Sequence, residues 1–148
     1  MITFQDYITT EFMDWLDSMS IYYKKINDNL YLIYKSDYCI KIYDRIGHGY
    51  GVTINLSQNY NETIYDGDTC SAYWVFSYLG LTAKSKFNSR TIIEYEKNMP
   101  LLIVDLKNLI VAIENVKVEF WDNAIKWIDI QSKKEFDIKN YSAQHAGK

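Results

Sequence analysis

The chain has 148 residues, 48% of them apolar, and a formal net charge of −3. This length predicts one ordinary domain whose core can fold without disulfides or a structural metal, and the apolar content excludes intrinsic disorder. The acidic balance excludes the basic footprint of a typical nucleic-acid-binding protein. No apolar run approaches the roughly 18 residues of a transmembrane helix, and acids interrupt the N-terminal stretch where a secretory signal would have its apolar core. We therefore expect a cytoplasmic protein with free thiols at Cys39 and Cys70, which binds neither nucleic acid nor a membrane.

The first predicted element is an amphipathic helix. Apolar residues recur at helical spacing from Ile8 to Met19, and Thr3 with Asp6 resembles a capping pair at the start. The helix is expected to end at Ser18 or Met19. Three acids lie off its apolar stripe: Glu11, Asp14 and Asp17.

An antiparallel meander is predicted next. Turn-forming residues at 27–29 and 36–37 separate runs rich in aromatic and β-branched residues. The expected strands cover residues 22–26, 30–35, 38–43 and 49–56.

Alternation of side chains assigns two faces to this sheet. We expect Leu32, Ile40 and Ile54 on the face that packs into the core. The opposite face is expected to be only partly wet and to carry, with several lysines, Tyr31, Ile33, Tyr43, Thr53 and Asn55. A slip of one residue would exchange every side chain between the faces, so this assignment is a sharp test.

A loop over 59–68 should lead into a helix that Asp68 caps and Gly80 ends. A strand over 73–78 is the alternative, because that segment is aromatic on both sides. Thr91 and Glu94 then form a capping box for a helix that runs to about residue 115, which Pro100 kinks or splits. Beyond it we expect a short strand over 116–120, a short helix or irregular segment over 121–130, and a frayed tail over 140–148, which leaves 1–139 as the domain. The elements together predict an α+β fold, an antiparallel sheet of four to five strands with helices packed mainly on one face.

Residues that could carry chemistry are few. His48 lies between two glycines that could form an anion-binding nest, but no helix follows, so a turn or bulge is favoured. A nucleophile set of His48, Cys70 and Asp44 has little support, because the chain has only two histidines. Asp66 and Asp68 lack the later ligands of a calcium loop. We expect no enzymatic activity, no cofactor and no metal.

Tyrosine is the residue type that points to a function. Nine of the fourteen tyrosines fall between Tyr22 and Tyr65, and tyrosine offers a large rigid contact area with one hydrogen-bonding tip. The bland alternative is coding bias, because Ile, Asn, Lys and Tyr together account for 58 residues, as in AT-rich genes. Residues 1–23 and 46–83 hold acids but no Lys or Arg, which predicts a partner with a basic surface. The candidate partner-binding residues are Asp14, Asp17, Tyr31, Tyr43, Asn55, Tyr60, Glu62, Tyr65 and Asp66.

Three segments followed by a long helix carry a resemblance to a known group. They are the strand over 49–55, the aromatic stretch Tyr73-Trp74-Val75-Phe76-Ser77-Tyr78-Leu79-Gly80-Leu81, and Phe87-Asn88-Ser89-Arg90. In layout and composition, over residues 30–115, the chain resembles the small bacterial immunity proteins of polymorphic toxin systems. The resemblance implies a cytoplasmic protein that binds and neutralises a cognate toxin, and it carries over no interface residue.

The favoured function is therefore a non-enzymatic protein-binding module, an immunity protein. One alternative is a small-ligand-binding or hydrolytic domain with a pocket near His48, Tyr43 and Cys70. The other is a homodimeric adaptor subunit that pairs through the sheet.

Overall fold

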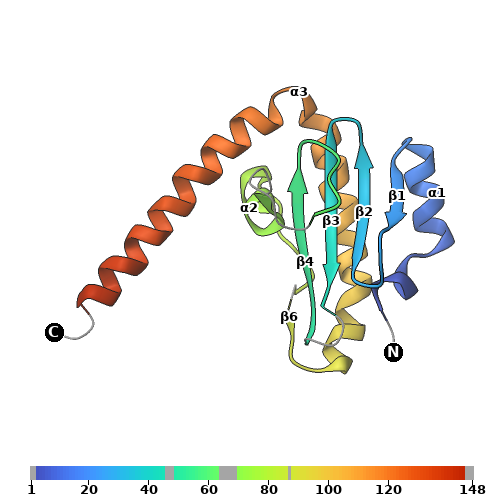
Figure 1. Ribbon diagram of the computed structural model, residues 1–148, viewed down its shortest axis with the longest axis horizontal. Helices are drawn as coiled ribbons and strands as arrows, with labels where there is room; N and C mark the ends of the chain where they lie inside the picture. Colours follow the sequence, from blue (N-terminus) through green and yellow to red (C-terminus); the bar gives the residue numbers. More distant parts are fainter. Residues whose placement is uncertain (1–2, 46–48, 64–69, 87, 146–148) are drawn as a thin grey trace.

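The computed structural model describes residues 3–45, 49–63, 70–86 and 88–145, with the backbone alone for 117–119 and 137–145 (Figure 1). An antiparallel sheet has the strand order β1-β2-β3-β4-β5, and β6 pairs with β4. Apolar side chains of three helices share one core cluster with one face of this sheet, so the predicted α+β class is confirmed. The elements are η1 (Phe4–Tyr7), α1 (Thr10–Ser18), β1 (Tyr22–Lys25), β2 (Leu30–Lys35), β3 (Tyr38–Asp44), β4 (Tyr50–Ser57), β5 (Cys70–Ser71), α2 (Ala72–Leu79), β6 (Asn88–Ser89) and α3 (Ile92–His145).

The N-terminal helix starts later than predicted. Thr3 and Asp6 do pair, with the Thr3 N–H donating to the Asp6 carboxylate at 2.7 Å, but they cap the short 3-10 helix η1. Extended backbone at Ile8 ends η1, and the Thr9 hydroxyl then caps α1 by accepting from the Phe12 N–H at 3.1 Å. The predicted end at Ser18 is confirmed.

The meander matches its predicted turns. Asn27 closes the first turn, because its side-chain oxygen accepts from the N–H groups of Asn29 and Leu30 at 2.8 and 2.9 Å. Residues 36–37 make the second turn, so Lys35 pairs with Tyr38 and β2 has its predicted bounds.

The predicted faces are confirmed in β3 and β4 but wrong in β2. Ile40 and Ile54 lie in the core cluster, whereas Tyr43 lies on the other face of the sheet. Pairing of Lys35 with Tyr38 places Ile33 opposite Ile40, and therefore on the core face. The two-residue turn fixes which residues of β2 and β3 share a face, so Tyr31 and Ile33 point into the core and Leu32 points away from it.

The face of the sheet that lies away from α3, termed here the second face, is more buried than predicted. Leu32, Cys39, Lys41 and Asn55 on it are all buried. The segment 58–63 passes over this face, on the side opposite α3 (Figure 1), and Lys41 Nζ donates to the Thr63 carbonyl at 2.6 Å. The sheet is thus covered on both faces.

The aromatic segment after β5 is a helix and not a strand. Ser71 caps it by accepting from the Tyr73 N–H at 3.3 Å, while the predicted cap Asp68 lies outside the described residues. Gly80 ends it with a φ of +70°, and the Leu81 N–H donates to the Phe76 carbonyl at 2.9 Å. This is the left-handed stop that glycine adopts without steric cost.

The last helix is much longer than predicted. Its start is confirmed, because Thr91 accepts from the Glu94 N–H at 3.2 Å and the Glu94 carboxylate accepts from the Arg90 N–H at 2.8 Å. Pro100 lies inside α3 without ending it, and the strand predicted over 116–120 is wrong. Buried residues continue at helical spacing beyond that point, at Phe120, Trp121, Ala124 and Ile128.

Tertiary packing explains why α3 is continuous. Buried Met99 and Leu102 hold the chain on both sides of Pro100, and further along Tyr78 of α2 contacts the rings of Phe120 and Trp127 at 5.9 and 5.6 Å. Figure 1 shows that α3 crosses behind the sheet, changes direction past its upper end and then extends away from the body of the molecule.

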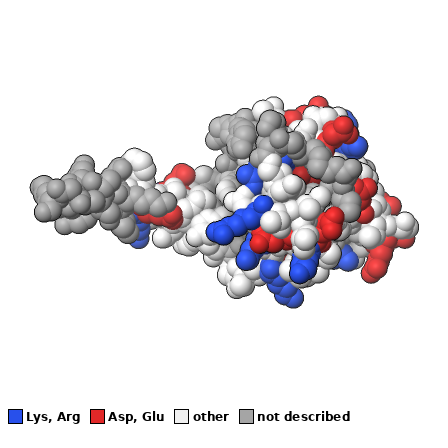
Figure 2. Space-filling model, turned by 90° about the horizontal axis from the view of Figure 1, so that it is seen from below, with Lys and Arg blue, Asp and Glu red and all other residues white. Residues whose placement is uncertain are grey.

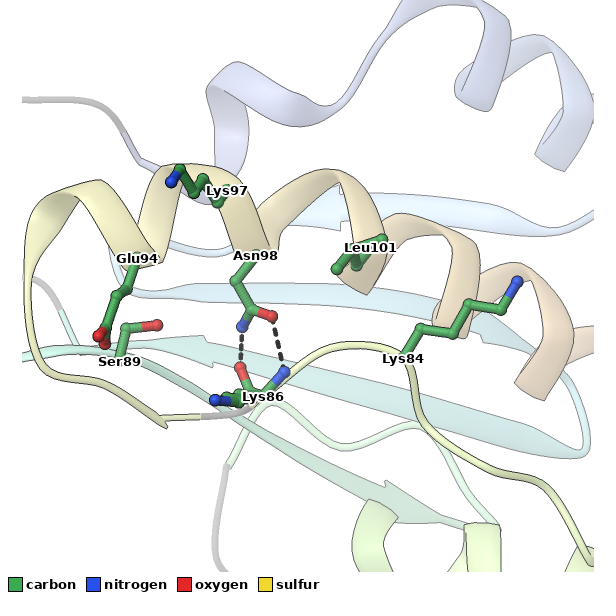
Figure 3. Close-up of a pocket in the computed structure, with 7 residues that line it drawn as sticks. All are labelled: Lys84, Lys86, Ser89, Glu94, Lys97, Asn98 and Leu101. Atoms are coloured by element: carbon green, nitrogen blue, oxygen red, sulfur yellow. Dashed lines mark hydrogen bonds between the residues drawn. The ribbon is translucent and has the colours of Figure 1, made fainter.

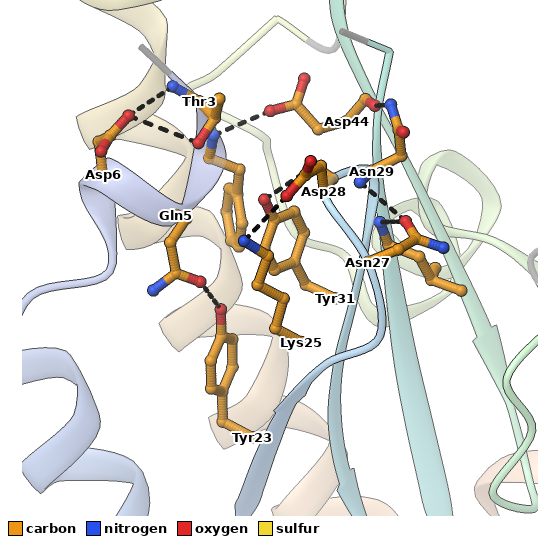
Figure 4. A network of polar contacts seen from close by, with 12 residues as sticks. Thr3, Gln5, Asp6, Tyr23, Lys25, Asn27, Asp28, Asn29, Tyr31 and Asp44 are labelled. Carbon is orange, nitrogen blue, oxygen red and sulfur yellow. Dashed lines mark hydrogen bonds and ion pairs between the residues drawn. The ribbon is translucent and has the colours of Figure 1, made fainter. Parts of the chain in front are cut away.

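A buried polar network ties the N-terminus to the lower end of the sheet (Figure 4). Its centre is Asp44, the last residue of β3, which is 2% exposed. One oxygen of Asp44, Oδ2, accepts from the Phe4 N–H at 2.8 Å and from the Tyr95 hydroxyl at 2.9 Å. One carboxylate therefore joins η1, β3 and α3.

Candidate protein-binding surface

Three tyrosines form a partly exposed ring cluster on the second face, termed here the tyrosine cluster: Tyr22, Tyr34 and Tyr60. Tyr22 and Tyr34 are directly opposite each other in β1 and β2, and their rings stack with centroids 5.5 Å apart. Tyr60 comes from the segment after β4 and meets the Tyr34 ring edge-on at 4.7 Å. Tyr22 is 63% exposed and Tyr60 is 42% exposed, so the cluster presents aromatic surface to solvent.

An ion pair borders the tyrosine cluster. Lys24 Nζ lies 3.0 Å from the Glu62 carboxylate and 5.9 Å from the centre of the Tyr60 ring. The Tyr60 hydroxyl donates to the same carboxylate at 2.5 Å. These two hydrogen bonds, first that of Tyr60 and then that of Lys24, lower the pKa of Glu62. Glu62 is therefore ionised at neutral pH, and it fixes the Tyr60 ring in place.

The segment that carries Tyr60 is held to the sheet beneath it. Besides the bond from Lys41 to Thr63, the Cys39 thiol lies 3.9 Å from the Asn61 carbonyl, and the Asn61 side chain accepts from the Thr63 N–H at 2.6 Å. A binding surface that is already ordered loses less conformational entropy when a partner docks.

The structure brings together only some of the predicted partner-binding residues. Tyr60 and Glu62 belong to the tyrosine cluster and its border. Tyr43 and Asn55 lie on the predicted face, but Tyr43 is half-buried near the opposite end of β3 and Asn55 is buried.

The predicted exposure of Tyr31 on the second face is wrong. Tyr31 is 1% exposed, because β2 turns it into the core, where its ring packs against Phe4 with centroids 5.1 Å apart. Its hydroxyl donates to the Asp28 carbonyl at 2.9 Å, so this phenol stabilises the fold and cannot contact a partner.

The remaining predicted residues lie elsewhere. Asp14 and Asp17 are exposed on α1, which runs beside β1 at the edge of the sheet (Figure 1). Tyr65 and Asp66 lie outside the described residues.

Sequence reasoning missed Tyr22, Tyr34 and Lys24. The sequence contained the information, because a two-residue turn at 36–37 pairs Tyr34 with Cys39 and so places Tyr34 on the second face together with Tyr43. The partners of β2 in β1 follow from the same register.

The structure does not bring Cys70 and Asp44, two of the residues suggested for a hydrolytic site, close to each other. Cys70 pairs with Leu56 and Asp44 pairs with Val52, so their partner positions are four residues apart along β4, roughly 13 Å. Cys70 and Asp44 also lie on opposite sides of β4, which separates them further. Burial, and then the charge of Asp129, raise the pKa of the Cys70 thiol, which disfavours the nucleophilic thiolate. His48 lies outside the described residues. Within the described ranges, no three His, Cys, Asp or Glu side chains gather as metal ligands would.

None of the helices, as far as the structure describes them, has the length and apolar character needed to cross a bilayer. Comparison of the chain with known protein families, with curated proteins and with solved structures finds no match.

Proposed function

We propose that this chain is a non-enzymatic protein-binding module, an immunity protein that neutralises a cognate bacterial toxin by binding it. The observation that carries the proposal is the tyrosine cluster, in which two exposed rings are held in place by stacking and by the bonds around Glu62. Exposed, ordered tyrosines at the centre of a polar border are the usual composition of a binding hot spot. The toxin enters through the resemblance in layout described above.

Charge supports the same proposal. The acids of α1 lie beside the edge strand that carries Tyr22, and residues 1–23 contain no Lys or Arg. An acidic flank attracts a basic partner and speeds its encounter with the adjacent aromatic surface. We therefore propose a toxin with a basic surface that docks across β1 and the segment 58–63.

We place this activity in the cytoplasm. Cys39 and Cys70 are free thiols, and β-pairing puts Cys39 on the second face and Cys70 on the core face. Reduced cysteines are characteristic of that compartment.

Truncating Tyr22 to Ala is expected to speed dissociation of the toxin and to cost about 2 kcal/mol of binding free energy, because hot-spot aromatics act mainly on the off-rate. Tyr22 is well exposed, so the fold should tolerate the change. The measurement is surface-capture kinetics with the product of the genetically linked toxin gene. Asp14→Lys combined with Asp17→Lys should instead slow association and weaken its salt dependence.

Tyr73→Ala is the matched control, because Tyr73 is 58% exposed, close to the 63% of Tyr22, but belongs to α2, outside the tyrosine cluster. Unchanged kinetics in the Tyr22 variant, or an equal loss in the control, would place the interface elsewhere. Absence of any binding by the native chain would remove the toxin from the proposal.

A homodimeric adaptor is the second candidate function. The part of α3 that extends from the body exposes large apolar side chains, with Ile130 at 55% and Phe136 at 62%. A helix that extends alone into water has little stability without a partner that covers its apolar side, because most helical stability in proteins comes from tertiary packing.

Replacing Ile130 and Phe136 together by Glu should convert a dimer into a monomer, as judged by light scattering coupled to size-exclusion chromatography. The exposed substitution Asn123→Glu on the same helix serves as the charge control and should leave the mass unchanged. A native chain that stays monomeric up to about 100 μM would exclude this candidate.

A further inference from the structure

A hollow of about 220 Å³ lies between the N-terminal part of α3 and the segment that precedes it (Figure 3). Lys97, Asn98 and Glu94 of α3 form one wall, and Lys84, Lys86 and Ser89 form the other. No residue of the tyrosine cluster or its border lines the hollow, and the proposed function does not use it.

Two side chains of α3 clamp the backbone of the second wall. The Asn98 amide accepts from the Lys86 N–H at 2.6 Å and donates to the Lys86 carbonyl (Figure 3). Asp105 accepts from the N–H groups of Lys84 and Ser85 at 2.9 and 2.8 Å, and also from the Ser85 hydroxyl. Both α3 residues are buried, so the segment cannot drift while the lysine side chains remain free to move.

The lysines around the hollow lack ion-pair partners in the part of the chain that the structure describes. Among the described residues, Lys84, Lys86 and Lys97 form no ion pair, and the three ion pairs of those residues lie elsewhere. Glu94 is the single acid in the wall, and its carboxylate is bonded to the Arg90 N–H at 2.8 Å.

Basic side chains gather at this end of the molecule although the chain is acidic. Both arginines of the sequence are here, since Arg90 immediately follows β6 and Arg45 donates to the Asn88 side chain. Figure 2 shows Lys and Arg side chains gathered near the middle of this end, with acidic side chains between them and along the right-hand edge. A hollow lined by three lysines that form no ion pair with another described residue favours an anion, although the net charge of the chain is −3.

We propose that this hollow binds a small phosphate-bearing anion. Three lysines line it, and their long flexible stems allow the ammonium groups to close on phosphate oxygens, each with three donors. The Ser89 hydroxyl supplies a further donor from the wall. Asn98 is engaged with the backbone and holds the site in shape, so it is a positioning residue.

The experiment uses pyrophosphate and inorganic phosphate as probes of the full chain, followed by amide chemical shifts in NMR titrations at low salt. Pyrophosphate is expected to bind with a Kd on the order of 1 mM, with shifts concentrated at Lys86, Ser89 and Lys97. Lys86→Gln and Lys97→Gln should each weaken it about threefold, as expected for one exposed charge. Glu94→Gln should tighten it about threefold, because a glutamine keeps the cap while removing the one negative charge.

Lys133→Gln is the matched control, an exposed lysine on the projecting part of α3. Opposite effects of the lysine and Glu94 variants, with none in the control, would support the site. Shifts spread over all exposed lysines, or an equal loss in the control, would show nonspecific screening and overturn it. A single-stranded oligonucleotide that binds more tightly than pyrophosphate at the same residues would assign the surface to nucleic acid and also overturn the proposal.

Discussion

Replacing Asp105 by Ala is expected to lower the free energy of unfolding by about 3 to 5 kcal/mol. Asp105 is 1% exposed and accepts three hydrogen bonds from residues 84 and 85. Its removal leaves two backbone N–H groups next to α3 without an acceptor, because the methyl group of alanine cannot accept a hydrogen bond and water has little access. The segment that links α2 to β6 would lose its main attachment to the core.

Urea denaturation, followed by circular dichroism, measures this change. Asp122→Ala is the matched control, because Asp122 is an exposed acid on the same helix and its loss should change stability by no more than about 0.5 kcal/mol. Asp105→Asn should fall between the two, because an amide keeps one acceptor oxygen. A loss below about 1 kcal/mol in Asp105→Ala would mean that water satisfies the freed N–H groups.

Local signals in the sequence were enough to predict most elements. The turn at Asn27, the cap at Thr91 and the glycine stop at Gly80 all involve bonds between residues fewer than six apart. Such contacts depend only on residues close together in the sequence, so the strand bounds and helix ends that they determine were predictable.

Long-range packing decided what was mispredicted. Pro100 lowers local helix propensity, but burial of Met99 and Leu102 against the sheet keeps α3 continuous. The Tyr78 contacts with Phe120 and Trp127 join residues more than 40 positions apart, and no local pattern predicts them. Propensity is a weak guide where tertiary contacts of this kind exist.

The candidate surface was predictable only in part for a related reason. Tyr60 and Glu62, which composition suggested, lie in the tyrosine cluster and its border. Tyr31 was assigned to the wrong face, and Tyr34 was missed with it. The proposed anion site depends on Asn98 and Asp105, whose bonds to the segment 84–86 join residues 12 and 21 positions apart, so no local pattern in the sequence predicts them.

Removing the Asp44 carboxylate is the second change with a large expected effect. Asp44→Ala leaves the Phe4 N–H and the Tyr95 hydroxyl without their acceptor, and both residues are buried. We expect a loss of about 2 to 4 kcal/mol in the free energy of unfolding. Asp44→Asn should cost much less, because both bonds end on Oδ2 and the carbonyl oxygen of an asparagine can take that position.

The asparagine variant also tests the charge of Asp44 through pH. Burial raises the pKa of Asp44 above its ordinary value of 3.8, against the opposing effect of the bonds from Phe4 and Tyr95. At pH values above 3.8 the folded chain therefore retains more of this proton than the unfolded chain does, so the contribution of Asp44 to stability falls as pH rises until the folded carboxyl has also ionised. The unfolding free energy of the native chain, less that of the Asp44→Asn variant, should therefore decline across that window by at most about 1.4 kcal/mol per pH unit. Urea titrations of both proteins between pH 3 and pH 7 measure this difference, in which the contributions of the other carboxylates cancel. A difference that rises with pH would mean that hydrogen bonding to the ionised form of Asp44 outweighs its burial.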